Sequence, residues 1–116
     1  MATFLTDKAP FFVNDPATAS AVTLQVGYTE IEASSTAATC SYTLPVPYAG
    51  AFVSVFQTVA NTSIKKVHTS STGITINKQG DQAVSLNGEG DSVQLLGKSS
   101  TRWVLVGVSG TPVFGT

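Results

Sequence analysis

The fold of this chain is decided by three runs in its C-terminal part: Gly73-Ile-Thr-Ile76, Val84-Ser-Leu-Asn-Gly-Glu-Gly-Asp-Ser-Val-Gln-Leu-Leu-Gly97 and Arg102-Trp-Val-Leu-Val106. Within them apolar and small polar residues alternate over short distances, and glycine-rich turns interrupt the alternation. Alternation with a period of two is typical of a strand with one buried and one solvated face. None of the three runs has helical spacing, so this part of the chain predicts antiparallel β-strands.

Working outward, the same pattern recurs along most of the chain at a spacing near ten residues. The predicted strands are residues 22–26, 28–32, 41–44, 51–60, 64–68, 73–77, 83–87, 91–96 and 102–108. Many short strands at regular spacing favour a sandwich or a barrel. We therefore predict an all-β fold, a compact antiparallel β-sandwich or barrel of about nine short strands with an extended N-terminal arm. No convincing internal repeat of about 20 to 50 residues is present, which argues against a solenoid.

The longest predicted strand, Ala51–Ala60, is apolar on both faces. Phe52 and Phe56 lie on one face and Val53 and Val55 on the other. Two apolar faces suit a strand that lies between two layers, of which the second is another sheet or another subunit. Together with the low charge of the chain, this strand predicts self-association.

The first part of the chain differs in composition from the rest. Residues 1–21 are predicted to be an extended arm, because Pro10 and Pro16 disfavour helix there, and residues 22–116 are predicted to form a single β-domain. The large apolar residues of the arm need a place to be buried, in their own domain or on a neighbouring chain. We predict that they make inter-subunit contacts: Phe4, Leu5, Phe11, Phe12 and Val13.

Composition excludes several classes of partner. Charged residues make up 11% of the 116 positions, against about 25% in ordinary soluble domains, and the net charge is −1. Without a basic stripe to neutralise phosphates, nucleic acid is not an expected partner. Without an apolar window of about 18 residues, a membrane is not expected either. We expect Lys65, Lys66, Lys98 and Arg102 to be solvated, and the single cysteine, Cys40, to be a small buried hydrophobe.

Residues capable of catalysis are few, and each has a structural interpretation that we prefer. His68 is the only histidine, and no Gly-x-Ser-x-Gly elbow accompanies it. Glu30 and Glu32 share a strand face in the manner of paired glycosidase carboxylates, although a solvated face is the simpler interpretation. We therefore predict that the protein is not an enzyme and uses no cofactor.

Two further features have a binding interpretation and a structural one. Asp81, Glu89 and Asp91 are close in sequence and could hold Ca²⁺, but their spacing matches no known calcium loop, and turn chemistry explains Asp81 and Asp91, which follow glycine. Trp103 could be a platform for a ligand, but such a residue is more often the largest side chain of a core. We predict no metal site and a structural Trp103.

Five pieces of the sequence resemble, in their order and spacing, a β-rich module of tailed-phage structural proteins. The pieces are Tyr42-Thr-Leu-Pro45, Gly73-Ile-Thr-Ile76, Leu86-Asn-Gly88, Gly90-Asp-Ser-Val-Gln-Leu95 and Thr101-Arg-Trp-Val-Leu-Val106. The module occurs in the trimeric tips of tail and head fibres and in small capsid decoration (cement) proteins. The resemblance covers residues 42–108 and implies a structural virion protein that is usually trimeric.

Two features of the chain favour capsid decoration within this group. A fibre tip normally follows a long shaft, whereas only about 20 arm residues precede this β-domain, and Met1-Ala2 resembles a native start. The implied partners are two further copies of the chain and the major capsid protein, on the exterior of a capsid assembled in the host cytoplasm. The alternative is a receptor-binding tip of a tail or head fibre that recognises a host-surface glycan through aromatics such as Tyr28, Tyr48 or Trp103.

Overall fold

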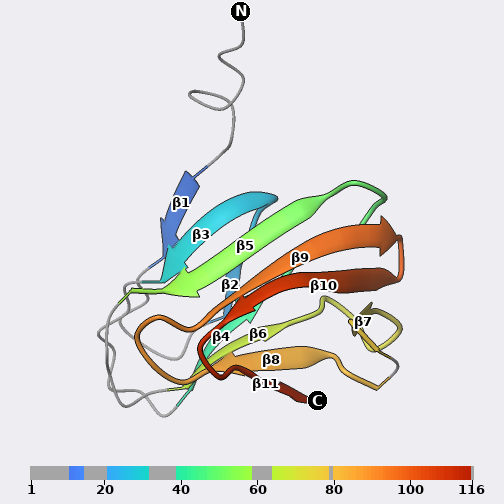
Figure 1. Ribbon diagram of the computed structural model, residues 1–116. Coiled ribbons are helices and arrows are strands. Elements are labelled where there is room, and N and C mark those ends of the chain that lie inside the picture. Colours follow the sequence, from blue (N-terminus) through green and yellow to red (C-terminus); the bar gives the residue numbers. More distant parts are fainter. Residues whose placement is uncertain (1–10, 15–20, 32–38, 59–63, 79, 116) are drawn as a thin grey trace, which may run out of the picture.

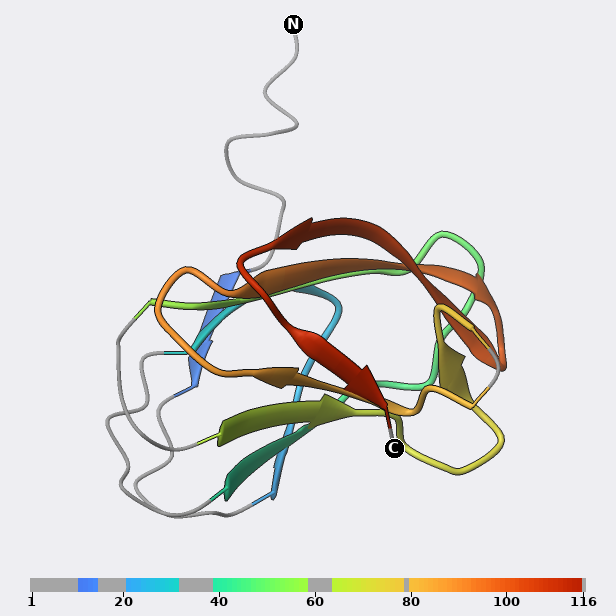
Figure 2. The ribbon, with the colours of Figure 1, turned by 60° about the horizontal axis from the view of Figure 1, so that its bottom comes forward.

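The computed structural model describes residues 11–14, 21–31, 39–58, 64–78 and 80–115, and these form two packed β-sheets without a helix (Figures 1 and 2). Sheet A contains, from edge to edge, β1 (Phe11–Asn14), β3 (Gly27–Ile31), β5 (Phe52–Gln57), β9 (Ser92–Ser99), β10 (Arg102–Ser109) and β7 (Thr75–Ile76). Sheet B contains β11 (Val113–Gly115), β8 (Ala83–Leu86), β6 (Ile64–His68), β4 (Thr39–Thr43) and β2 (Ala21–Thr23). The prediction of an all-β, sandwich-like fold is confirmed.

All nine predicted strands are present, as β2 to β10, with boundaries shifted by a few residues. The described residues add two strands, β1 at an edge of sheet A and β11 at an edge of sheet B. The prediction of antiparallel sheets is wrong, because five of the nine strand pairs in the described residues are parallel: β1–β3, β3–β5, β2–β4, β4–β6 and β7–β10. The barrel alternative is wrong as well, since the strands form two separate sheets.

The parallel pairs follow from the path of the chain. Along the sequence, strands alternate between the two sheets at every connection except the β9–β10 hairpin. Parallel neighbours need a crossover between them, and here a strand of the opposite sheet supplies it. The first six strands thus wind as a coil, with β1, β3 and β5 on one side and β2, β4 and β6 on the other (Figure 2).

The turns of this coil differ in length, which explains why the sequence shows no repeat. In sheet A, Phe11 lies beside Tyr28, and Gly27 lies beside Val53. In sheet B, Thr39 lies beside Ile64. Because successive turns contain different numbers of residues, the coil has no fixed period that a sequence comparison could detect.

The hydrophobic core lies between the sheets and is built from the inward positions of both. Trp103 of β10 is 0% exposed, which confirms its predicted structural role. The other large side chains with almost no exposure include Tyr42, Leu24, Leu44, Ile76, Leu86 and Leu95. Cys40 is buried and free, as expected.

The expected solvation of the basic residues is wrong for two of them. Lys65 is 0% exposed, in register between Cys40 of β4 and Leu86 of β8. Successive strand residues point to opposite faces, so one member of the Lys65–Lys66 pair has to point inward. Arg102 is half-buried and donates a hydrogen bond from Nη2 to the carbonyl oxygen of Asn77.

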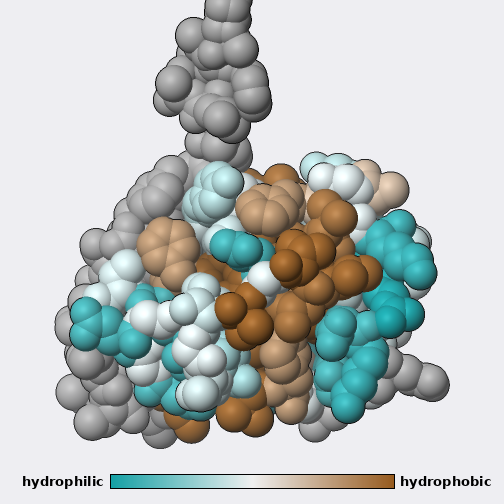
Figure 3. Space-filling model, viewed as in Figure 1, coloured by the Kyte–Doolittle hydropathy of each residue, from teal (hydrophilic) through white to brown (hydrophobic). Residues whose placement is uncertain are grey.

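The outer face of sheet A, the face turned away from sheet B, carries an apolar patch. We call the sheet A patch the residues Tyr28, Phe52, Phe56, Leu96 and Val104, which occupy outward register positions on β3, β5, β9 and β10. The rings of Tyr28 and Phe52 meet edge to face with centroids 5.7 Å apart. Figure 3 shows hydrophobic surface gathered over β9 and β10 on this side of the molecule. In the described residues, no helix is present that could cross a membrane.

Candidate functional site

A cavity of about 480 Å³ opens on the outer face of sheet B, opposite to the sheet A patch. Its wall combines strand residues of β4, β6 and β8 with the connection that leaves β6. The lining residues are Ser41, Lys66, His68, Thr69, Ser70, Ser71, Thr72, Gln82 and Ala83. The cavity therefore offers hydroxyl groups, one amide, one ammonium and one imidazole.

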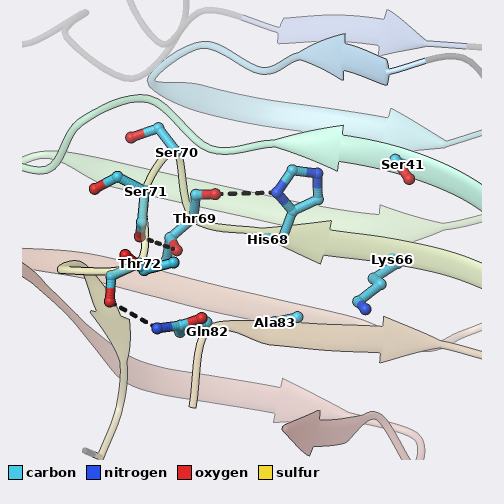
Figure 4. Close-up of a pocket in the computed structure, with 9 residues that line it drawn as sticks. All are labelled: Ser41, Lys66, His68, Thr69, Ser70, Ser71, Thr72, Gln82 and Ala83. Carbon is cyan, nitrogen blue, oxygen red and sulfur yellow. Dashed lines mark hydrogen bonds between the residues drawn. The ribbon is translucent and has the colours of Figure 1, made fainter. Parts of the chain in front are cut away.

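Strand register brings the charged and polar side chains together. Lys66 and His68 are two residues apart on β6, so both point outward while Lys65 and Val67 point into the core. Ser41 of β4 lies beside Lys66, and Ala83 of β8 lies beside His68. Figure 4 shows Lys66 and His68 on one face of the sheet, with the residues of the connection at one end.

The imidazole of His68 is held by hydrogen bonds on both ring nitrogens. Nδ1 lies 3.0 Å from the carbonyl oxygen of Thr69, which can only accept, so Nδ1 carries a proton. Nε2 lies 3.3 Å from the hydroxyl oxygen of Thr43. On the neutral ring Nε2 is therefore the acceptor, and it becomes a donor only on the protonated ring.

The connection after β6 is fastened to the start of β8. The Thr69 hydroxyl donates to the Ser71 carbonyl at 3.0 Å, and the Gln82 amide donates to the Thr72 carbonyl at 2.6 Å (Figure 4). The backbone N–H of Thr69 donates to the carbonyl of Gln82 at 2.9 Å. These bonds fix the shape of the wall before any ligand arrives.

The arrangement around His68 supports binding better than catalysis. A hydroxyl, an imidazole and an orienting acceptor follow one another in the order of a nucleophile, a base and an orienting group. However, the orienting group is a neutral carbonyl, and Thr43 does not line the cavity. Among the described residues that line the cavity none is acidic, so it presents donors and positive charge.

The sequence pattern does not predict this cavity. From the pattern, Lys66 is expected to be solvated and His68 to have a structural role. The available signal was the spacing of two residues between Lys66 and His68, followed directly by the hydroxyl run Thr69–Thr72. Ser41 lines the cavity because β4 pairs with β6, and the alternation of apolar and polar residues does not specify which strands pair.

The predicted carboxylate groups are not brought together. Asp91 is buried and accepts from the backbone N–H groups of Asn87 at 2.9 Å and Thr111 at 3.2 Å, so it joins the β8–β9 and β10–β11 turns. Asp81 is buried in the β7–β8 turn, and Glu89 is exposed. Across the part of the chain that the structure describes, no group of three or more His, Cys, Asp or Glu could hold a metal ion.

The other candidate carboxylate, Glu32, lies outside the described residues, and Glu30 is placed only as a strand position in β3. The aromatic residues proposed to stack on a glycan differ in the exposure of their side chains. Tyr48 is 56% exposed and Tyr28 36%, whereas Trp103 is buried and cannot serve as a platform.

The predicted contact residues of the arm fall into two groups. Phe11, Phe12 and Val13 lie in β1, whose backbone pairs in parallel with β3 at the edge of sheet A. Phe4 and Leu5 lie outside the described residues. The contact role of all five residues stays a prediction.

In comparisons with known proteins, no family model and no curated protein matches this chain at a significant level.

Proposed function

We propose that this chain is a non-enzymatic virion structural protein, a capsid decoration (cement) protein that binds the assembled phage capsid as a homotrimer and stabilises it. The observation that carries this proposal is the apolar outer face of sheet A (Figure 3). Exposed apolar surface of this kind is typical of proteins that work by packing against other proteins. The resemblance of residues 42–108 to phage structural modules supports the virion setting.

The sheet A patch is not needed to complete the fold. The inward residues of β5, Val53 and Val55, are 0% exposed and already join the core between the sheets. The outward residues of the same strand, Phe52 and Phe56, remain half-buried. An apolar face that lies outside the core is explained best by burial against another chain.

The occupant that suits the patch best is a second copy of this chain. The polar residues in register with the patch are Ser54, Ser92 and Gln94, which are uncharged, and Glu30, which lies beside Phe56. Because Glu30 lies on β3, an outermost strand of the patch, the apolar positions of β5, β9 and β10 can meet a copy of themselves without like-charge repulsion. A strongly charged partner would find no complementary group among these positions. The number of three copies comes from the resemblance.

Stabilisation of the capsid then follows from mass action. A protein that binds the assembled lattice more tightly than free subunits shifts the equilibrium toward the lattice. Three linked copies raise the effective concentration of each contact, so weak individual contacts are sufficient. The arm residues Phe4, Leu5, Phe11, Phe12 and Val13 are proposed to supply the contacts to the major capsid protein or to a neighbouring subunit.

The homotrimer is tested by light scattering coupled to size exclusion at micromolar concentration. We expect about three times the 12.0 kDa mass of one chain for the wild type. Leu96→Lys places a charge within the patch and is expected to give monomers, because a buried unpaired ammonium is costly. Val113→Lys is the matched control, since Val113 is 60% exposed on β11 of the other sheet, and it should remain trimeric. A measured mass near 12.0 kDa for the wild type contradicts the homotrimer.

The exposure of one aromatic residue, Tyr48, favours the receptor-binding alternative. Tyr48 is 56% exposed in the connection between β4 and β5, where its ring could stack on a sugar. Cryo-electron microscopy of the virion decides between the two functions. Density on the capsid exterior supports decoration, and density at the end of a fibre supports receptor binding.

A further inference from the structure

We infer that the cavity on sheet B binds an oxyanion group carried by a hydroxyl-rich ligand, of which the carboxylate of an acidic sugar is the type. This site is separate from the proposed function, which uses the sheet A patch on the opposite side of the sandwich. The inference rests on Lys66, His68 and the hydroxyl groups that line one cavity without an acidic residue among them.

The positive groups are arranged for a single small anion. Strand geometry places Lys66 and His68 roughly 7 Å apart along β6 on the same face. A carboxylate, sulfate or phosphate group that enters between them meets the ammonium of Lys66 on one side and the imidazole on the other. Charge-assisted hydrogen bonds of this kind are stronger than neutral ones.

His68 is held in place beside the cavity by the hydrogen bond from Nδ1 to the Thr69 carbonyl and by the contact of Nε2 with the Thr43 hydroxyl. Lys66 is the charged side chain that lines the cavity with it. The residues that face it from β4 and β8 are uncharged: Ser41, Thr43, Ala83 and Ser85.

The remaining lining residues match the rest of a sugar. Ser41 and the run Ser70–Thr72 offer hydroxyl groups that both donate and accept, as sugar hydroxyls do. The wall is already fixed by the bond from Gln82 to Thr72, so little ordering is required on binding. The volume, about 480 Å³, lies within the range of small-molecule sites, about 300–1,000 Å³.

The test is a titration of the isotope-labelled protein with three probes, followed by NMR at constant ionic strength. The probes are glucuronate, glucose and inorganic phosphate. We expect glucuronate to shift the amide signals of residues 66–72, and we expect glucose to bind much more weakly. Absence of glucuronate shifts at the cavity overturns the inference. Phosphate binding as tight as that of glucuronate overturns the role of the hydroxyl groups.

Two variants and one matched control assign the effect to the cavity. Lys66→Gln should weaken glucuronate binding by about tenfold, the effect of losing one hydrogen bond to a charged group. His68→Gln removes the imidazole that lines the cavity and should also weaken glucuronate binding. Lys98→Gln removes the same charge from the exposed end of β9, outside the cavity, and should leave binding unchanged. An equal loss in Lys98→Gln indicates non-specific attraction and overturns the inference.

Discussion

At the scale of single residues, Trp103 makes the largest contribution to the core. It is 0% exposed and lies in register between Gly97 of β9 and Ile76 of β7, so it joins the hairpin to the short edge strand. Trp103→Ala is expected to lower the free energy of unfolding by about 3–5 kcal/mol, as for other large-to-small core substitutions. Chemical denaturation measures this loss.

Two further variants make this prediction sharper. Within the described part of the chain, the indole nitrogen of Trp103 has no hydrogen-bond partner, so Trp103→Phe should recover much of the stability. Tyr48→Ala removes an aromatic ring that is 56% exposed and should change stability by less than about 0.5 kcal/mol. An unchanged free energy of unfolding in Trp103→Ala would refute the core role.

Burial of individual residues could be predicted where residue type and strand position agree. Trp103 is apolar and stands in a clean alternation, so its burial was foreseen. Lys65 was assigned to the surface because lysine is almost always exposed, yet its strand position points it inward. For such a residue, the alternation of inward and outward positions along the strand decides burial, even against the preference of the residue type. Val67 lies two residues further along β6 on the same face and is also buried.

At the scale of elements, the backbone of β9 at Gly97 lies close to residues 48–51, which precede β5. The N–H of Gly97 donates to the Ala51 carbonyl at 2.7 Å, and its carbonyl accepts from the N–H of Gly50 at 3.0 Å. A Cβ atom at this position would collide with the backbone carbonyl oxygen of Tyr48. Gly97→Ala is therefore expected to destabilise the protein by at least about 1–3 kcal/mol, the usual cost of overpacking.

The matched control for this prediction is Gly73→Ala. A Cβ atom on Gly73 meets nothing within 4 Å, and its backbone does not require glycine. Thermal unfolding should show a clear loss for Gly97→Ala and little change for Gly73→Ala. Equal melting temperatures of the two variants would contradict the close approach of the backbones.

The existence of the strands could be predicted from the sequence, but their pairing could not. Alternation identifies which residues share a face and says nothing about which strand lies alongside. The parallel coil of β1 to β6 was therefore missed. So was the bulge between Leu105 and Gly107. The alternation predicts that Gly107 shares the inward face of Trp103, whereas after the bulge it pairs with the outward Gln94 of β9.

At the scale of the whole molecule, the pieces of sequence on which the proposed phage resemblance depends lie largely in the core. The pieces that carry it supply residues of the core: Tyr42, Leu44, Ile74, Ile76, Leu86, Val93, Leu95 and Trp103. The outer faces of the two sheets are built from other residues, so a function that works through surfaces has to be inferred from those faces.

The cavity on sheet B illustrates the same separation between core and surface. It joins Ser41 to residues 66–72 and to Gln82, which are distant in sequence and meet only after β4, β6 and β8 have paired. Hydrophobic periodicity reports the inward residues of these strands. The outward residues, which line the cavity, are polar and produce no periodic signal of their own.

The arm is the last feature at this scale, and two truncations separate its roles. Deleting residues 2–10 removes Phe4 and Leu5 and keeps β1, whereas deleting residues 2–16 also removes β1 and its pairing with β3. We expect the shorter deletion to unfold at the wild-type temperature and to lose co-sedimentation with capsids. The longer deletion should also melt at a lower temperature, because sheet A loses a strand.

The reason for this expectation is the distribution of binding energy. Burying one large apolar side chain contributes roughly 1.5–3 kcal/mol, and ordering each residue costs about 1–2 kcal/mol, so one arm gains little by itself. In the proposed trimer three arms would act together, and removing Phe4 and Leu5 would remove six of the proposed anchors at once. The double variant Phe4→Ser/Leu5→Ser, which keeps the length of the chain, should reproduce the loss of capsid binding. If either the shorter deletion or this double variant binds capsids with wild-type affinity, these residues are not the anchor, and attachment has to come from the faces of the β-domain.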